Sequence, residues 1–222
     1  DEIVNFLSKN NVNIISTGGT QKYIESIGAD VTPISAITGQ SAVMDGRVKT
    51  LHPKIFGGIL ADRNNSNHMD DLNDLGGIPI DMVIVNFYPF VSEAVSKQLD
   101  LKKAIEYIDI GGPSMIRSAA KNYHSVIPLC DNSQFSEFIE SYKENKGEIP
   151  LHTRQKWASE VFSMTSEYES SIYSYLTPEK KIIPKSISIK LNKSESLRYG
   201  ENPHQSAGFY TEPQNELPWK QL

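Results

Sequence analysis

The segment DMVIVNFYPF, residues 81–90, carries the strongest indication of fold in this chain of 222 residues. Its first half is a near-continuous apolar run, which is typical of a strand covered on both faces of a parallel sheet. In its second half Asn86 and Tyr88 are two residues apart and therefore share one face. Polar side chains at the end of such a strand need partners. The segment predicts a buried strand ending either at a ligand site or at a structural asparagine turn.

The sequence on both sides of this segment alternates between strand and helix patterns. VNIIST (residues 12–17) reads as a strand followed by a glycine turn and a helix that stops at Gly28. LKKAIEYIDIGG (residues 101–112) reads as a helix interrupted by its glycine pair, with Pro113 in the first turn of a new helix. SVIPLC (residues 125–130) reads as a strand, followed by a capped helix and by a longer helix over residues 152–176. This order predicts an α/β domain with a mostly parallel sheet.

Composition limits the classes of function. The chain is 38% hydrophobic and 22% charged, with a net charge of −5, which argues against a protein that binds nucleic acid through bulk charge. The single cysteine, Cys130, excludes an internal disulfide and a cysteine-based zinc cluster, and we expect no metal site. No apolar run is long enough to span a membrane, and the start has no signal-peptide pattern. We expect a cytoplasmic protein.

The character of the sequence changes after Thr177. PEKKIIPKSISIKLNKSES is rich in lysine, serine and proline, as linkers are, and LRYGENPHQSAGFY then resumes a structured composition. We expect a first domain over residues 1–176, a linker over 177–195, and the incomplete start of a second domain over 196–222. The chain opens on a helical spacing with no strand ahead of it.

Two segments suit an anion. In STGGT the glycines let the backbone approach a ligand, and the following helix N-terminus offers free N–H groups, although a plain tight turn explains the motif equally well. In GRVKTLHP, Arg47 offers a planar fork and Lys49 a point charge, although a solvated basic loop is the alternative. We interpret His52 as structural rather than catalytic.

A third candidate is IDIGGPSMIRSAAKN, residues 108–122. Asp109 stands just ahead of a helix, where a carboxylate is favoured by the dipole, so that helix capping is a serious alternative to catalysis. Arg117 and Lys121 lie one turn apart on one face. From Pro113 to Lys121 the helix rises roughly 12 Å. One site uses both ends only if its ligand is long, as a nucleotide is, or if Lys121 leans back along the helix.

In this order, STGGT, GRVKTLHP, NFYPF, IDIGGPSMIRSAAKN and LRYGENPHQ resemble the AICAR transformylase/IMP cyclohydrolase family over essentially the whole chain. The resemblance implies a three-layer, methylglyoxal-synthase-like α/β domain. It implies that this domain closes the ring of 5-formamidoimidazole-4-carboxamide ribonucleotide (FAICAR) to give IMP and water, without a cofactor or metal. It also implies a homodimer in the full-length protein.

The resemblance assigns residues to this reaction. It gives the substrate-binding residues as Thr17, Gly18, Gly19, Thr20, Arg47, Thr50, Asn86, Ile110, Gly111 and Gly112. It gives the catalytic residues as Lys49, Tyr88, Asp109 and Lys121. Asp109 is expected to act as base or orienter, Lys49 and Tyr88 to stabilise oxygen charge, and Lys121 to donate or relay a proton.

Two departures from the family pattern limit these expectations. The family's first strand, with its serine–aspartate–lysine turn, has no match, so we expect a missing strand and weaker binding of the phosphate end. The transformylase lysine–histidine motif is also missing, so Arg198 and Tyr199 are expected to contribute only part of a site that uses 10-formyltetrahydrofolate. Methylglyoxal synthase itself and a regulatory purine-nucleotide module are the alternative functions.

Overall fold

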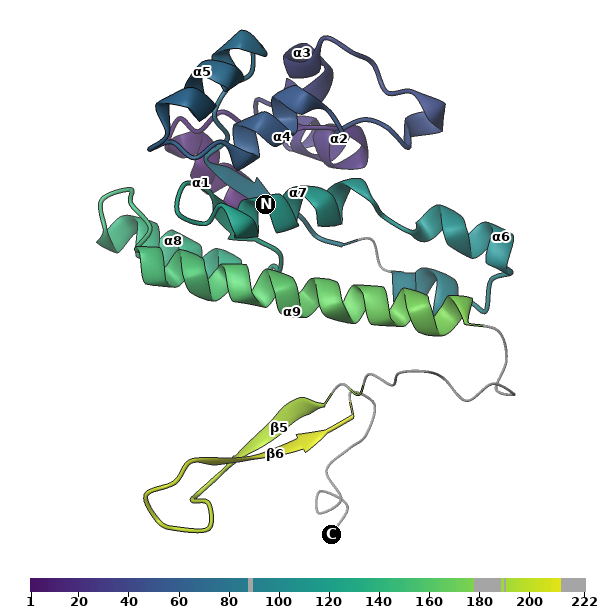
Figure 1. Ribbon diagram of the computed structural model, residues 1–222, viewed down its shortest axis with the longest axis vertical. Helices are drawn as coiled ribbons and strands as arrows, with labels where there is room; N and C mark the ends of the chain where they lie inside the picture. The colour runs from purple at the N-terminus through teal and green to yellow at the C-terminus, as the bar shows by residue number, and fades with distance from the viewer. Residues whose placement is uncertain (88–89, 178–188, 190, 213–222) are drawn as a thin grey trace. The chain divides into compact units, whose positions relative to one another are not determined.

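The computed structural model describes residues 1–87, 90–177, 189 and 191–212 (Figure 1). The chain divides into two compact units, Asp1–Ile172 and Tyr173–Leu222. Most of the expected linker, the last ten residues and Tyr88 lie outside the described residues. In the described part of the chain, no helix is both long and apolar enough to cross a membrane.

The first unit holds two pairs of parallel strands. β1 (Ile15–Ser16) pairs with β2 (Thr32–Pro33), and β3 (Met82–Ile84) pairs with β4 (Ile127–Leu129), with Ile84 opposite Leu129. The predicted strands are confirmed in place and direction, although each is shorter than its apolar run. Within this unit the described strands form two separate pairs rather than one sheet.

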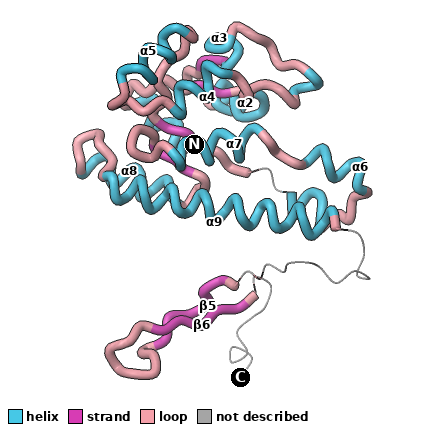
Figure 2. The backbone as a smooth tube through the Cα atoms, viewed as in Figure 1, coloured by secondary structure: helices cyan, strands magenta, loops and turns pink. Residues whose placement is uncertain are grey.

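Helices surround these pairs (Figures 1 and 2). They are α1 (Glu2–Lys9), α2 (Gly18–Ser26), α3 (Ile34–Thr38), α4 (Pro53–Leu60), α5 (Ser66–Asp74), α6 (Leu101–Ala104), α7 (Gly111–Lys121), α8 (Gln134–Glu144) and α9 (Leu151–Leu176). Short helical turns cover Met44–Gly46, Val91–Val95 and Ile105–Tyr107.

Two expectations about helix ends need correction. The glycine pair at 111–112 does not interrupt a helix, because α6 and its turn end at Tyr107 and the pair opens α7, with Pro113 in the first turn as predicted. The side chain of Ser133 forms no capping hydrogen bond to α8. Instead, the buried Gln134 side chain stabilises the turn before α8, because its oxygen accepts the backbone N–H groups of Cys130 and Asp131.

Strand β3 is covered on both faces. Val83 and Val85 pack with α4 and α7 in a cluster that includes Ile59 and Ile116, whereas Met82 and Ile84 pack against a second cluster. The members of the second cluster come mainly from α1, β4, α8 and α9: Ile3, Leu7, Leu129, Phe138, Ile139, Ile149 and Trp157. Successive side chains of a strand point to opposite faces, so this division makes three layers with β3 and β4 in the middle. The prediction of a buried parallel strand is confirmed.

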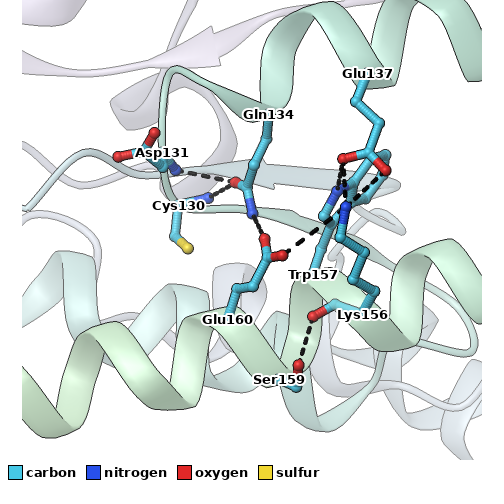
Figure 3. A network of polar contacts seen from close by, with 8 residues as sticks. All are labelled: Cys130, Asp131, Gln134, Glu137, Lys156, Trp157, Ser159 and Glu160. Carbon is cyan, nitrogen blue, oxygen red and sulfur yellow. Dashed lines mark hydrogen bonds and ion pairs between the residues drawn. The ribbon is translucent and has the colours of Figure 1, made fainter. Parts of the chain in front are cut away.

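The long helix α9 is joined to α8 by polar contacts at its first turns (Figure 3). The Glu137 carboxylate accepts hydrogen bonds from the Lys156 amine at 2.8 Å and from the indole N–H of Trp157 at 3.1 Å. The hydrogen bond from Lys156 lowers the pKa of Glu137. Since the Trp157 side chain is fully buried, these contacts satisfy the one polar group that it carries into the core.

The second unit contains an antiparallel hairpin. β5 (Asn192–Leu197) pairs with β6 (Ala207–Thr211), and every residue of β5 is exposed. Arg198 and Tyr199 follow β5 directly, and the Tyr199 side chain is exposed. A single two-stranded hairpin, here with one exposed strand, is at best marginally stable in water by itself.

Candidate active site

A cavity of about 2050 Å³ in the first unit is lined by most of the residues that the sequence motifs single out. One part lies where β1 and β3 end and α2 and α7 begin. In parallel α/β proteins this edge, at the carboxyl ends of the strands, is the usual place for a ligand. The cavity also continues between the two strand pairs, along the apolar side chains of Ile15 and Met82.

The STGGT turn presents a helix N-terminus to this cavity. Thr17 is extended, with φ −149° and ψ 161°, and forms no side-chain cap on α2. Gly18 has φ +60°, a conformation that glycine adopts without strain. The residues from Thr17 to Thr20 all line the cavity. The first N–H groups of α2 are therefore arranged as in an anion site.

The GRVKT segment folds back towards the same turn. A bridge between Val43 and Val48 closes a tight loop in which Met44 and Asp45 both have φ 53° and Gly46 has φ 89°. The Lys49 side chain packs against Gly46, where a Cβ on the glycine would lie only 2.6 Å from Lys49 Cε. The Lys49 amine lies 3.6 Å from where a Cβ of Gly18 would stand. The structure therefore brings Lys49 to the STGGT turn.

Arg47 has a different surrounding. Its guanidinium donates to the Glu106 carboxylate in an ion pair with both side chains more than half exposed. Arg47 still lines the cavity, so an anion has to compete with Glu106 for it. His52 accepts the backbone N–H of Lys54 through Nδ1 and caps α4, as the structural interpretation predicts.

Asp109 and Thr50 both lie against the glycine pair at the start of α7. Asp109 Oδ1 accepts the backbone N–H of Gly112 at 3.1 Å, so the carboxylate does cap the helix while its second oxygen stays available. The buried Thr50 hydroxyl would lie 2.7 Å from a Cβ on Gly111, and Asp109 Oδ2 would lie 2.4 Å from one on Gly112. Neither position has space for a larger side chain. The two glycines therefore leave room for the Thr50 and Asp109 side chains to pack against the start of α7.

The remaining residues of the predicted site have fewer contacts that tie them to this helix end. Asn86 lines the cavity at the end of β3, and Ile110 lines it with an exposed side chain. Tyr88 lies outside the described residues.

Lys121 is the last residue of α7, roughly 15 Å along the helix from Gly111, and is not among the residues that line the cavity. Arg198 and Tyr199 belong to the second unit.

Three residues near the site gave no usable signal in the sequence. Glu106 pairs with Arg47, Asn132 pairs with Asn86, and the Tyr168 hydroxyl accepts the backbone N–H of Asp109 at 2.8 Å. Burial raises the pKa of Tyr168, which therefore stays a neutral hydrogen-bonding phenol. Tyr168 stands in the middle of α9, 59 residues from Asp109, so only the folded chain shows the contact. Within the described residues no cluster of three or more His, Cys, Asp or Glu side chains suits a metal ion.

Comparisons with known proteins divide the chain between two family models. Residues 1–114 match the MGS-like domain, and residues 119–222 match the AICARFT/IMPCHase bienzyme. A crystal structure of ForH superposes with a TM-score of 0.67 at 26% identity, covering 79% of this chain and 92% of that one.

Curated relatives match almost the whole chain. The bifunctional purine biosynthesis protein PurH of Clostridium kluyveri is 46% identical over 99% of this chain and 43% of its own length. PurH of Leptospira biflexa is 46% identical over 94% of this chain and 41% of its own, and PurH of Clostridium botulinum is 43% identical over 99% and 43%. The chain spans less than half the length of these relatives.

Proposed function

Because the chain belongs to the AICARFT/IMPCHase bienzyme family and opens with its MGS-like domain, we propose that the first unit is an IMP cyclohydrolase. It would convert FAICAR to IMP and water. The observation that carries the proposal is that the STGGT turn, Lys49, Thr50, Asn86 and Asp109 all line one cavity. That arrangement would offer an anion site and a carboxylate to one ligand.

The reaction needs little beyond orientation and proton transfer. The carboxamide nitrogen attacks the formyl carbon and a C–N bond forms. The formyl oxygen leaves as water with one hydrogen from the carboxamide nitrogen and one from the formamido nitrogen. A phosphate at the start of α2, next to the Lys49 amine, would fix one end of the substrate. The free oxygen of Asp109 would take a proton from the nitrogen, while the N-terminus of α7 supports the charge of the carboxylate. Holding the two reacting arms together supplies much of the rate.

We propose different roles for Lys49 and Lys121 because they lie at different positions relative to the cavity. The position of the Lys49 amine beside Gly18 supports a contact with the phosphate, and a role on the reacting oxygen would require the amine to leave that turn. Lys121, at the far end of α7, would have to lean back along the helix to donate a proton. Arg198 and Tyr199, with 10-formyltetrahydrofolate, would belong to a transformylase site completed by residues outside this chain, in a protein that we propose to be a homodimer.

The test is a spectroscopic assay of FAICAR conversion by this chain. Asp109→Asn keeps an oxygen that accepts the Gly112 N–H but removes the charge, so it separates capping from catalysis. We expect turnover to fall about 100-fold or more, the usual contribution of a general base, with the free energy of unfolding changed by less than about 1 kcal/mol. Lys121→Ala should also slow turnover, and Lys102→Ala, which removes an exposed lysine of α6, should not. Wild-type rates for both Asp109→Asn and Lys121→Ala would overturn the assigned roles.

The position of Lys121 favours one alternative, a regulatory module that binds a purine nucleotide without converting it. That function predicts an increase of the melting temperature with IMP and no conversion of FAICAR by the wild-type chain. Conversion of FAICAR by the wild-type chain would exclude it.

A further inference from the structure

Asn132 stands beside Asn86 at the cavity although nothing in its sequence surroundings marks it. β3 and β4 are parallel neighbours, with Ile84 opposite Leu129, so the residues that follow them emerge at one edge. Asn86 and Asn132 both line the cavity there with exposed side chains. Nδ2 of Asn86 donates a hydrogen bond to Oδ1 of Asn132 at 2.9 Å.

The turn that carries Asn132 is stabilised by hydrogen bonds to a buried side chain. Gln134, only 4% exposed, accepts the backbone N–H groups of Cys130 at 2.8 Å and Asp131 at 3.0 Å through its side-chain oxygen (Figure 3). Its amide nitrogen donates to Glu160 on α9. Asp131 in turn accepts the backbone N–H of Ser133 at 2.8 Å. Four fixed hydrogen bonds therefore place Asn132, whose own side chain stays at the cavity.

The hydrogen bond to Asn132 determines which atom Asn86 presents to a ligand. A carboxamide has one oxygen acceptor and one NH₂ donor group, which occupy nearly the same shape. Because the NH₂ of Asn86 donates a hydrogen to Asn132, the amide is held from turning over, and its oxygen is the acceptor that it offers to a partner in the cavity. An oxygen accepts from the amide N–H of a 6-oxopurine or from a carboxamide NH₂, but it finds no hydrogen on the N1 atom of a 6-aminopurine.

We propose that Asn132 is a positioning residue that orients the Asn86 carboxamide and thereby makes the site select a 6-oxopurine ribonucleotide, or its open carboxamide precursor, over a 6-amino one. The inference rests on the proposed function in taking Asn86 as a contact of the base. In the reaction, the Asn86 oxygen accepts a hydrogen of the attacking nitrogen and holds that nitrogen in line with the formyl carbon.

The experiment compares the binding of IMP and AMP by calorimetry. These nucleotides differ at C6 and N1, where IMP has an oxygen and an N–H, and AMP has an amino group and a bare nitrogen. Wild-type protein should bind IMP at least about tenfold more tightly, since AMP would leave the Asn86 oxygen unpaired once the bound base covers it. Asn132→Ala frees the Asn86 amide to turn and should bring the two affinities within about threefold of each other.

Two variants separate orientation from general disturbance. Asn132→Asp keeps the oxygen that accepts from Asn86 and should keep the preference for IMP, even where the added charge weakens both nucleotides. Ser133→Ala alters the same turn but neither member of the amide pair, and should behave as wild type.

The outcomes also separate this inference from the proposed function. An unchanged ratio of IMP to AMP affinity in Asn132→Ala, or a lost preference for IMP in Asn132→Asp, overturns the role of Asn132. Conversion of FAICAR by the wild-type chain would still support the proposed function. The expected pattern of affinities without conversion supports Asn132 as a positioning residue in a binding module. Absence of binding by either nucleotide to the folded wild-type chain contradicts the inference.

Discussion

At the scale of single residues, the position of the Lys49 amine depends on Gly46. Gly46 has φ 89° and no Cβ, and the Lys49 side chain occupies the space that a Cβ would take. A methyl group there would move a flexible side chain rather than backbone, so the protein should fold with Lys49 displaced from Gly18.

Gly46→Ala is therefore expected to weaken binding of IMP about tenfold, the size of a lost charge-assisted hydrogen bond to phosphate. The matched control is Gly39→Ala, because Gly39 has φ +72° but open space at its Cβ position and does not line the cavity. Both variants should lose roughly 1–2 kcal/mol of unfolding free energy to left-handed strain. Calorimetric titration and chemical denaturation measure the two effects, and equal loss of affinity in both variants would contradict the role of Gly46.

Which residues of the site could be predicted depends on how far apart their partners lie in sequence. The glycine turn and the Asp109 cap act within a few residues, so the motif itself indicates the geometry. Asn132 and Tyr168 act on Asn86 and Asp109 across 46 and 59 residues, and their own surroundings look like an ordinary turn and helix. Only the pairing of β3 with β4 and the course of α9 bring them into contact.

At the scale of elements, the contact of α8 with α9 responds to pH through Glu137. Its hydrogen bond from Lys156 lowers its pKa below the ordinary 4.5. A group whose folded pKa is lowered stabilises the fold above its unfolded pKa, and this stabilisation is lost as the pH falls through the lower, folded value. The contribution should therefore disappear below about pH 4.5.

Glu137→Gln is expected to cost roughly 1 kcal/mol or less at neutral pH, because the ion pair with Lys156 is about half exposed. The difference from wild type should shrink as the pH falls below 4.5. Urea unfolding over a series of pH values measures it. Glu140→Gln on the same helix, an exposed position, is the control and should run parallel to wild type. A difference that stays constant into acid would show that the charge of Glu137 is irrelevant.

The elements themselves were mostly predictable, and the exceptions have physical causes. The run at residues 81–87 predicts a strand longer than β3, which spans only Met82–Ile84. A strand extends as far as its backbone has a partner, and among the described strands β3 pairs only with β4. Likewise VNIIST predicts six extended residues where β1 has two. Side-chain pattern indicates burial, whereas strand length follows from pairing that a single segment does not reveal.

At the scale of the whole molecule, the two strand pairs of the first unit leave unpaired edges facing one cavity. Ile127 donates to the Asp81 carbonyl and Val85 donates to that of Leu129, so the backbone groups of Met82 and Ile84 point away from β4. In the other pair Thr32 donates to Ile14, so the groups of Ile15 point away from β2.

Apolar side chains line this cavity from both pairs, and Asp1 lines it as well. An extended segment joined to Asp1 would be followed by α1 and then by β1. That order is the strand–helix–strand unit of parallel sheets. We therefore expect the cavity to accept one further parallel strand that unites β1 and β3 in a single sheet.

The test is a chain extended ahead of Asp1 by a designed Val/Ile-rich segment of about eight residues, a common strand length. Burying several such side chains, less the cost of ordering the segment, should add a few kcal/mol of unfolding free energy and raise the melting temperature by roughly 5–10 °C. A Gly/Ser segment of the same length is the control and should change neither. Backbone amides of Met82 and Ile84 should exchange with solvent more slowly in the first extended chain, because they gain hydrogen-bond partners. Equal melting temperatures for the two extended chains, with unchanged exchange at these amides, would rule out the added strand and leave the cavity as part of the ligand site alone.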